Sequence, residues 1–306
     1  MAKVTNAFDS FQATGNREDL SNLITMISPL EAPAYDRFAT VKATGRYHEW
    51  QTYDLAAAAA NANIEGAVFS GKAVRSSSRY GNYCQVMVNM FSITDTQNIV
   101  DKAGKTSETA FQRTNALKEL KRDCEFALFA SAAAVSVSGI SGATNVAPLM
   151  KSINDWQILV LAQTGVSGQV TANTVTEGQF NAQLQAAWGN GAKINTVYCG
   201  GAIKRVISGW GVSTSRPRDA GLGVKLVNRV DVYDSDFGEL DIVLDRYVGT
   251  SSCFLLDDNL FAKAELVPTR EKQIADTGLA ANTMIWNQWT LEARNPTGSA
   301  MFFSGP

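Results

Sequence analysis

Alternating polar and apolar positions mark two strands that flank a long segment of small residues in the first third of the chain. The first strand covers residues 48–55, and the second, rich in Val, Met and aromatic side chains, covers 82–94. An alanine patch at 56–60 and a Gly/Ser-rich stretch at 66–78 lie between them. The pattern predicts a long two-stranded excursion over 46–94.

The length of this two-stranded segment determines what it can contact. A strand of about 20 residues spans roughly 60 Å, whereas a compact chain of this size has a radius of gyration of about 19 Å. An isolated two-stranded ribbon is only marginally stable in water. We therefore expect the ribbon to reach beyond its own body and to lie on a neighbouring subunit.

The clearest helical period runs over residues 106–131, where apolar side chains recur at spacings of three and four. Twenty-six residues make a rod of about 39 Å. An ordinary long core helix would show the same period, so the pattern alone does not assign the rod a special role. The expected stripe comprises Ala110, Arg113 by its stem, Leu117, Leu120, Cys124 and Ala127, widened by Phe111 and Leu128. The core positions predicted from it are Phe111, Leu117, Leu120 and Cys124.

The remaining pattern predicts a mixed α+β architecture. Thr176 and Gln179 fit a capping box at the start of a helix. In a strand at 239–247, Leu240, Ile242 and Leu244 alternate with acidic residues, which predicts a half-buried strand. The further expected elements are helices at 17–27, 177–188 and 202–208, a first hairpin arm at 224–233, a loop at 132–150 and a strand at 284–294.

Composition narrows the class of function. Charged residues make up 18% of the chain, below an average of about 25%, which suits a subunit that buries surface against copies of itself. The net charge of -2 provides no excess of cations for phosphates, so sequence-independent DNA binding is not the expected main task. The four cysteines form no CxxC pair, which predicts free buried thiols in a reducing cytoplasm. Neither a signal peptide nor a membrane span is expected.

No chemical motif in the sequence is complete. Residues 66–73 nearly match a phosphate-binding loop, but Ala73 stands where a Mg²⁺-ligating hydroxyl is required. We interpret this stretch as the tip of the arm, with a basic patch of Lys72, Arg75 and Arg79. His48 is the only histidine, and packing or a hydrogen bond explains it better than catalysis. We expect no catalytic, metal-binding or cofactor-binding residue, and no cofactor.

Several short strings together resemble the SU10-like family of tailed-bacteriophage major capsid proteins. No single string is specific, but their order and spacing match over about 16–125 and 230–296, and the match is weak over 140–230. The strings are 16–38, 48–55 followed by Glu65-Gly66, 82–85, 94–97, Glu119 to Asp123, Tyr233 with Ser235 to Gly238, and Leu291 to Asn295.

The resemblance implies the HK97-like capsid fold, an α+β fold that encapsulins share. The expected divisions are an N-terminal arm at 1–45, an extended loop at 46–94, a peripheral domain with a spine helix at 95–144, an axial domain at 145–250 and a return to the peripheral domain at 251–306. The expected inter-subunit contacts of the loop are His48, Glu49, Trp50, Gln51, Glu65, Lys72, Arg75, Arg79 and Tyr83.

The function implied is that of a structural protein rather than an enzyme. Copies would assemble into hexamers and pentamers of an icosahedral head around double-stranded DNA, which they would not bind sequence-specifically. The expected partners are further copies, a decoration protein, a separate scaffolding protein and a portal, with no membrane. The protein would be made in the host cytoplasm and end in the virion. Two alternatives stay open, an encapsulin-like nanocompartment shell and, remotely, a nucleotide-binding enzyme that uses residues 66–73.

Overall fold

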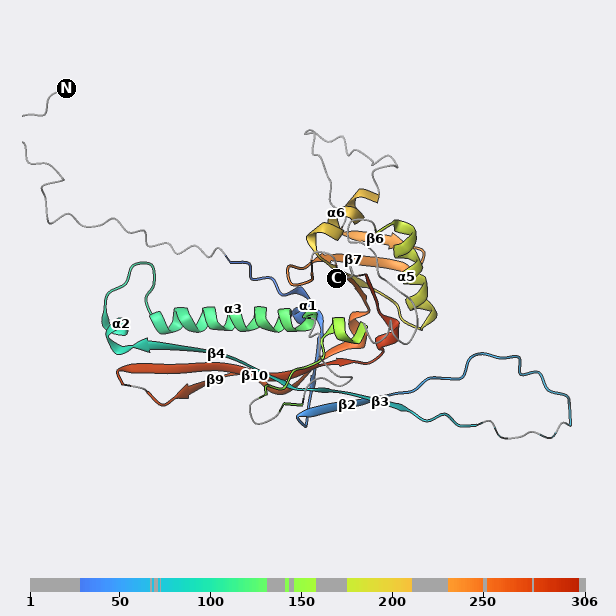
Figure 1. The fold of residues 1–306 in the computed structure, drawn as a ribbon, viewed down its shortest axis with the longest axis horizontal. Coiled ribbons are helices and arrows are strands. Elements are labelled where there is room, and N and C mark those ends of the chain that lie inside the picture. Colours follow the sequence, from blue (N-terminus) through green and yellow to red (C-terminus); the bar gives the residue numbers. More distant parts are fainter. Residues whose placement is uncertain are drawn as a thin grey trace, which may run out of the picture.

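The computed structural model describes residues 28–66, 68, 71, 73–130, 141–142, 146–157, 175–210, 231–249, 252–276 and 278–302. A four-stranded sheet with a long helix along it extends to one side of the molecule, a five-stranded sheet lies beyond its other end, and a slender two-stranded extension leaves the body (Figure 1). The predicted helix at 17–27, the predicted hairpin positions 224–230 and Lys72 lie outside the described residues.

Four strands form a sheet with the order β1-β9-β10-β4. The strand predicted at 284–294 is confirmed as part of β10, which begins earlier than expected. β1 runs parallel to β9, whereas β10 is antiparallel to both of its neighbours. The bounds are β1 Ala39–Lys42, β9 Phe261–Ile274, β10 Ala280–Ala293 and β4 Gln85–Thr94.

The placement of β4 corrects the expected end of the extended loop at residue 94. β4 pairs with β10 along its whole length, from Gln85 opposite Trp289 to Thr94 opposite Ala280. Its alternate side chains, including Met87 and Phe91, pack against the helix that covers the sheet. The two-stranded extension therefore ends at Tyr83, and residues 85–94 belong to the four-stranded sheet.

The predicted long helix is confirmed as α3 (Glu108–Phe129), which lies along the four-stranded sheet (Figure 1). Ser107 caps it, because its hydroxyl accepts a hydrogen bond from the Ala110 amide. A short helix, α2 (Asp95–Ile99), connects β4 to the segment before α3. The buried line of α3 repeats every four residues and consists of Ala116, Leu120, Cys124 and Leu128.

Two predicted core positions of α3 need correction. Leu117 is 43% exposed, and Phe111 is half-buried, with the Lys105 ammonium 5.0 Å from its ring centroid. Successive residues of a helix are about 100° apart around its axis. The buried line passes through Ala116, so Leu117 is turned away from the sheet. Leu120 and Cys124 are buried as predicted.

The second sheet has the order β11-β8-β5-β7-β6, and helices α5 and α6 lie beside it (Figure 1). The capping box predicted for Thr176 and Gln179 is present at the start of α5. The helix predicted at 202–208 is confirmed as α6. The bounds are α5 Glu177–Gly189, α6 Gly201–Trp210, β5 Thr196–Cys199, β6 Val232–Ser235, β7 Gly238–Leu244, β8 Cys253–Leu256 and β11 Ala300–Phe302.

One expectation for this region is wrong. Within 251–306, β8 and β11 join the second sheet, and β9 and β10 join the four-stranded sheet, so the domain assigned to this segment stays a prediction. The alternation in β7 holds for Leu240 and Ile242, which are buried, but Leu244 is 51% exposed and Asp245 is buried. The strand ends at Leu244, so its alternation does not extend to Asp245.

One core joins the two sheets where α3 ends. It combines Trp289 and Leu291 of β10, Leu128 of α3, Tyr198 of β5 and Phe254 of β8. All four cysteines are buried and free, as predicted. Burial raises the pKa of the Cys84 and Cys124 thiols to about 11, which keeps both protonated and unreactive near neutral pH.

Candidate assembly surfaces

The base of the extended loop is a two-stranded ladder of β2 (Tyr47–Thr52) and β3 (Ser78–Tyr83). His48 Nε2 lies 2.9 Å from Glu292 Oε2, and the Trp50 indole N–H donates to the Ala293 carbonyl, also at 2.9 Å. Both contacts join the ladder to the end of β10. The expected hydrogen bond of His48 is confirmed, and the polar groups of both side chains tie the loop to its own body. Contact of His48 and Trp50 with a neighbouring subunit stays a prediction.

Asn82 provides a second anchor for the ladder. Its side-chain amide donates to the carbonyls of Lys151 and Leu291, and its oxygen accepts from the Lys151 amide. The residue is completely buried. Since three backbone groups depend on this one side chain, Asn82 fixes the angle at which the loop leaves the body.

Beyond the ladder, the loop leaves the body altogether (Figure 1). Every described residue of 53–77 is exposed. Apolar side chains are among the most exposed of the chain, at 82% for Leu55, 82% for Ile64 and 91% for Val74. Apolar groups held this far into water indicate a contact surface that the single chain leaves uncovered.

The other loop residues predicted to contact a neighbour are placed as follows. Glu49 and Arg79 form an ion pair of 3.0 Å across the ladder, and Gln51 accepts a hydrogen bond from Ser77 at 3.3 Å. The Arg75 guanidinium reaches the Leu55 carbonyl at 3.5 Å. Glu65 is exposed. Tyr83 packs on Tyr47, with ring centroids 4.5 Å apart. Contact of these residues with a second copy stays a prediction.

A second uncovered surface is the face of the four-stranded sheet opposite α3, here called the open sheet face. Val86, Val88 and Met90 of the edge strand β4 are 43%, 50% and 51% exposed on it. Directly opposite residues share a face of a sheet, so Trp286, which pairs with Val88, extends the apolar stripe onto β10. The Arg270 guanidinium lies 4.5 Å from the Trp286 ring centroid and borders the stripe.

A third uncovered surface, here called the peripheral tip, lies at the far end of the same sheet. Ile99 and Val100, at the end of α2, are 83% and 52% exposed, and Leu279, before β10, is 77% exposed. The Asp95 amide donates to the Leu279 carbonyl at 3.0 Å and joins the two segments. The tip therefore presents a small apolar surface at a point remote from the second sheet.

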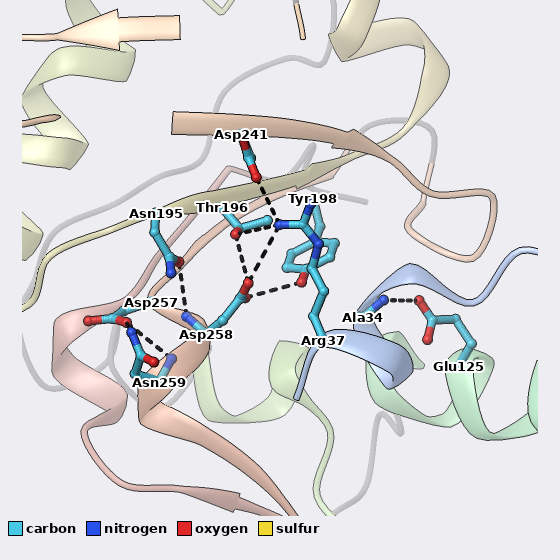
Figure 2. Close-up of polar contacts among 10 residues, drawn as sticks. All are labelled: Ala34, Arg37, Glu125, Asn195, Thr196, Tyr198, Asp241, Asp257, Asp258 and Asn259. Atoms are coloured by element: carbon cyan, nitrogen blue, oxygen red, sulfur yellow. Dashed lines mark hydrogen bonds and ion pairs between the residues drawn. The ribbon is translucent and has the colours of Figure 1, made fainter. Parts of the chain in front are cut away.

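A polar junction holds the segment before β1 against the second sheet (Figure 2). Arg37 of α1 (Pro33–Arg37) lies 3.1 Å from both Thr196 Oγ1 and Asp241 Oδ2. Asp258 accepts from the hydroxyls of Thr196 and Tyr198 and lies 3.8 Å from Arg37. Burial raises the pKa of Asp258 above its ordinary value. The sequence reasoning missed this junction, since its members are spread over more than 200 residues.

The contact between His48 and Glu292 predicts how the stability of the protein changes at acidic pH. The hydrogen bond from His48 is the main reason why the pKa of Glu292 is below its ordinary value. A lowered carboxyl pKa contributes stability above about pH 4.5 that is lost as pH falls through the folded-state value. We expect Glu292→Gln to lose less thermal stability than the wild type between about pH 5 and pH 3.

Calorimetry at a series of pH values measures this difference. Glu49→Gln is the matched control, because Glu49 lies on the same ladder but forms only an exposed pair with Arg79. The control should follow the wild type. Parallel acid profiles for the wild type and Glu292→Gln would show that the contact with His48 does not stabilise the loop base.

The described residues offer little to catalysis or metal binding. No group of three or more His, Cys, Asp or Glu residues there could hold a metal ion. The stretch at 66–73 continues through irregular backbone into β3, whereas a phosphate-binding loop leads into a helix. Among the helices of the described ranges, none is both long and apolar enough to cross a bilayer.

Solved structures with the same architecture define the class of protein. The chain superimposes with a TM-score of 0.73 on a protein of the cyanophage A-1(L) capsid asymmetric unit, at 11% identity over 98% of this chain and 99% of that one. A capsid protein of a native GTA particle, with C5 symmetry, gives a TM-score of 0.64 at 10% identity over 97% and 98%. The fold is the HK97-like α+β capsid fold.

The sequence comparison identifies the family. The model described as SU10 major capsid protein matches residues 3–304, so the chain belongs to the SU10 major capsid protein family. The major capsid protein of Escherichia phage Phieco32 is 22% identical over an alignment of 340 positions, which covers 97% of this chain and 96% of the relative. The chain is thus a phage structural protein and a component of the virion, not an enzyme, and the match favours a phage head over an encapsulin-like shell.

Proposed function

We propose that copies of this chain assemble into hexameric and pentameric capsomers of an icosahedral head that encloses double-stranded DNA. The observation that carries the proposal is the extended loop, in which every described residue of 53–77 is exposed while its base is fixed by Asn82, His48 and Trp50. A fixed base with an uncovered end indicates a segment built to contact another molecule. The matched solved structures are of capsids, which supports assembly of this chain into a shell.

The open sheet face of an adjacent copy is the surface on which the loop would lie. The loop carries Leu55, Ile64 and Val74, and the open sheet face carries Val86, Val88 and Met90. Covering apolar side chains stabilises by about 25 cal/mol per Å² of area removed from water. Each loop contact is modest, but every subunit of a ring both gives and receives one, so the ring gains stability from repetition.

The proposal has four further parts: the role of the peripheral tip, the domain division, the enclosure of DNA and the partners of the chain. The peripheral tip, with Ile99, Val100 and Leu279, would meet other capsomers, because it lies remote from the second sheet. The division into arm, loop, peripheral and axial domains is proposed with the loop shortened to 46–83. A net charge of -2 suits a wall that encloses DNA without reading its sequence. Synthesis in the host cytoplasm, and partnership with scaffolding, portal and decoration proteins, belong to the same proposal.

Shortening the loop tests the proposal. Replacing residues 56–75 by a short Gly/Ser linker keeps the ladder of β2 and β3 intact, including the pair of Thr52 and Ser78. We expect a folded subunit with unchanged circular dichroism that forms no closed shells. Sedimentation velocity and electron microscopy measure assembly. Normal shells from this deletion would remove the loop from the mechanism.

Point variants separate the loop's surface from its length. The triple variant Leu55→Ser, Ile64→Ser, Val74→Ser changes side chains that are more than 80% exposed, so the subunit itself should lose almost no stability. We expect a large loss of assembly from it. The double variant Asn61→Ala, Asn63→Ala is the matched control, since the Asn63 side chain bonds only to Asn61 within the same loop. That control should assemble like the wild type.

A further inference from the structure

Two buried carboxyl groups meet where α1, α3 and the second sheet come together. Glu125 of α3 is completely buried, and Asp245, directly after β7, is 3% exposed. The two side chains lie within hydrogen-bonding reach of each other. Two ionised carboxylates in direct contact repel, so a buried pair of this kind is stable only when it holds a proton.

The donors around the pair leave one oxygen for that proton. Glu125 Oε1 and Oε2 accept from the amides of Ala34 and Tyr35, at 2.9 Å and 2.7 Å (Figure 2 shows the first). Asp245 Oδ1 accepts from the Tyr247 amide at 2.8 Å. Asp245 Oδ2 is buried and has no hydrogen-bond donor within the described part of the chain. A proton held between this oxygen and Glu125 would satisfy it.

Neighbouring charges do not neutralise the pair. The basic groups nearby have other partners: Lys121 lies 2.8 Å from Asp36, Arg37 3.1 Å from Asp241 and Arg246 3.5 Å from Glu31, while Lys263 donates to the Tyr35 carbonyl and Lys204 to the Ile242 carbonyl. Glu125 also lies in the last turns of α3, where the helix dipole disfavours negative charge. The other titratable groups that act on the pair are Tyr198, beside Glu125, and Cys199, beside Asp245.

We propose that Glu125 and Asp245 share one proton, and that its loss weakens the contact between the spine helix and the second sheet. The amides of Ala34 and Tyr35 retain the Glu125 carboxylate after ionisation, because each donates to one of its oxygens. Repulsion therefore acts on Asp245 and on the end of β7. The pair is a proton-sensitive joint between the two sheets, and it does not depend on the assembly proposed above.

The expected pH range follows from the chemistry of the joint. Burial, and then the contact with Asp245, raise the pKa of Glu125 well above its ordinary value. A carboxyl whose pKa is raised in the folded state stabilises that state. This contribution is complete below the unfolded-state pKa of about 4.5 and is lost as pH rises through the folded-state pKa. Between these limits the unfolding constant rises about tenfold per pH unit from this one proton.

Two substitutions isolate the joint. Asp245→Asn keeps an oxygen for the Tyr247 amide and offers Glu125 an N–H in place of the shared proton. Glu125→Gln removes the titrating group. We expect the wild type to lose thermal stability relative to Glu125→Gln as pH rises from about 6 to 9, by about tenfold in the unfolding constant per unit up to the folded pKa. Asp245→Asn should shift this loss to a lower pH.

Carbon-13 NMR of the full chain with labelled glutamate carboxyls provides a readout that does not depend on a variant's stability. We expect one glutamate resonance whose midpoint lies above about pH 6, and Asp245→Asn should move this midpoint to a lower pH. The Glu125→Gln spectrum should lack it. A wild-type spectrum in which every glutamate titrates below about pH 6 would overturn the proposal, as would parallel pH profiles of stability for the wild type and Glu125→Gln.

Discussion

Leu120→Asp is expected to unfold the subunit or to lower its free energy of unfolding by about 4 kcal/mol or more. Leu120 is 2% exposed and packs with Ala116 and Ile285 between α3 and the sheet. The aspartate would lose this apolar contact and place a charge in an interior that offers it no cation. Equilibrium denaturation of the wild type and the variant measures the difference directly.

Leu117→Asp is the matched control on the same helix. Leu117 is 43% exposed and lies one position away from the buried line. The same chemical change should therefore cost about 1 kcal/mol or less. Equal losses at the two positions would show that the sheet covers a different face of α3. Impaired assembly of a stable Leu117→Asp subunit would add this face of the spine helix to the inter-subunit surfaces.

Asn82→Ala is expected to lower the free energy of unfolding by about 3 kcal/mol or more, and to loosen the extended loop. The side chain satisfies the amide and carbonyl of Lys151 and the carbonyl of Leu291, all in a fully buried setting. A buried polar group that loses its partner costs about 1–3 kcal/mol. Alanine is too small to keep water out completely, so part of this cost is recovered by hydration.

Hydrogen exchange provides the second readout for Asn82→Ala. Amides of β2 and β3 should exchange faster than in the wild type, because the ladder loses its connection to β10. Asn63→Ala is the control, since Asn63 is exposed and bonds only to Asn61. Unchanged exchange in β2 and β3 despite a loss of global stability would show that Asn82 supports the core but not the loop.

Local patterns predicted the elements of this fold well. The capping box of Thr176 and Gln179 and the period of α3 depend on residues within one or two turns, and both are confirmed. The covered face of α3 was harder to predict. Its buried line includes Ala116 and also Glu125, whose burial depends on amides of α1 some 90 residues away. A hydropathy pattern places Glu125 in solvent and Leu117 in the core, whereas the structure buries Glu125 and exposes Leu117.

The hydropathy pattern along the chain could not predict which distant segments contact each other. The alternation in β4 shows that one face is covered, but not that β10, almost 200 residues later, is its partner. The exposed loop at 53–77 was predicted because its composition and length leave it no place on the body. The contacts of His48 with Glu292 and of Trp50 with Ala293 join residues more than 240 positions apart, so the local pattern could not predict them.

Single-particle electron microscopy of the assembled wild-type protein tests the central claim most directly. The account predicts closed shells built from rings of five and six copies, with density for residues 53–77 lying on the open sheet face of the adjacent copy. Shells in which this segment contacts only its own chain, or a preparation that stays monomeric with the segment folded back on its own sheet, would contradict it.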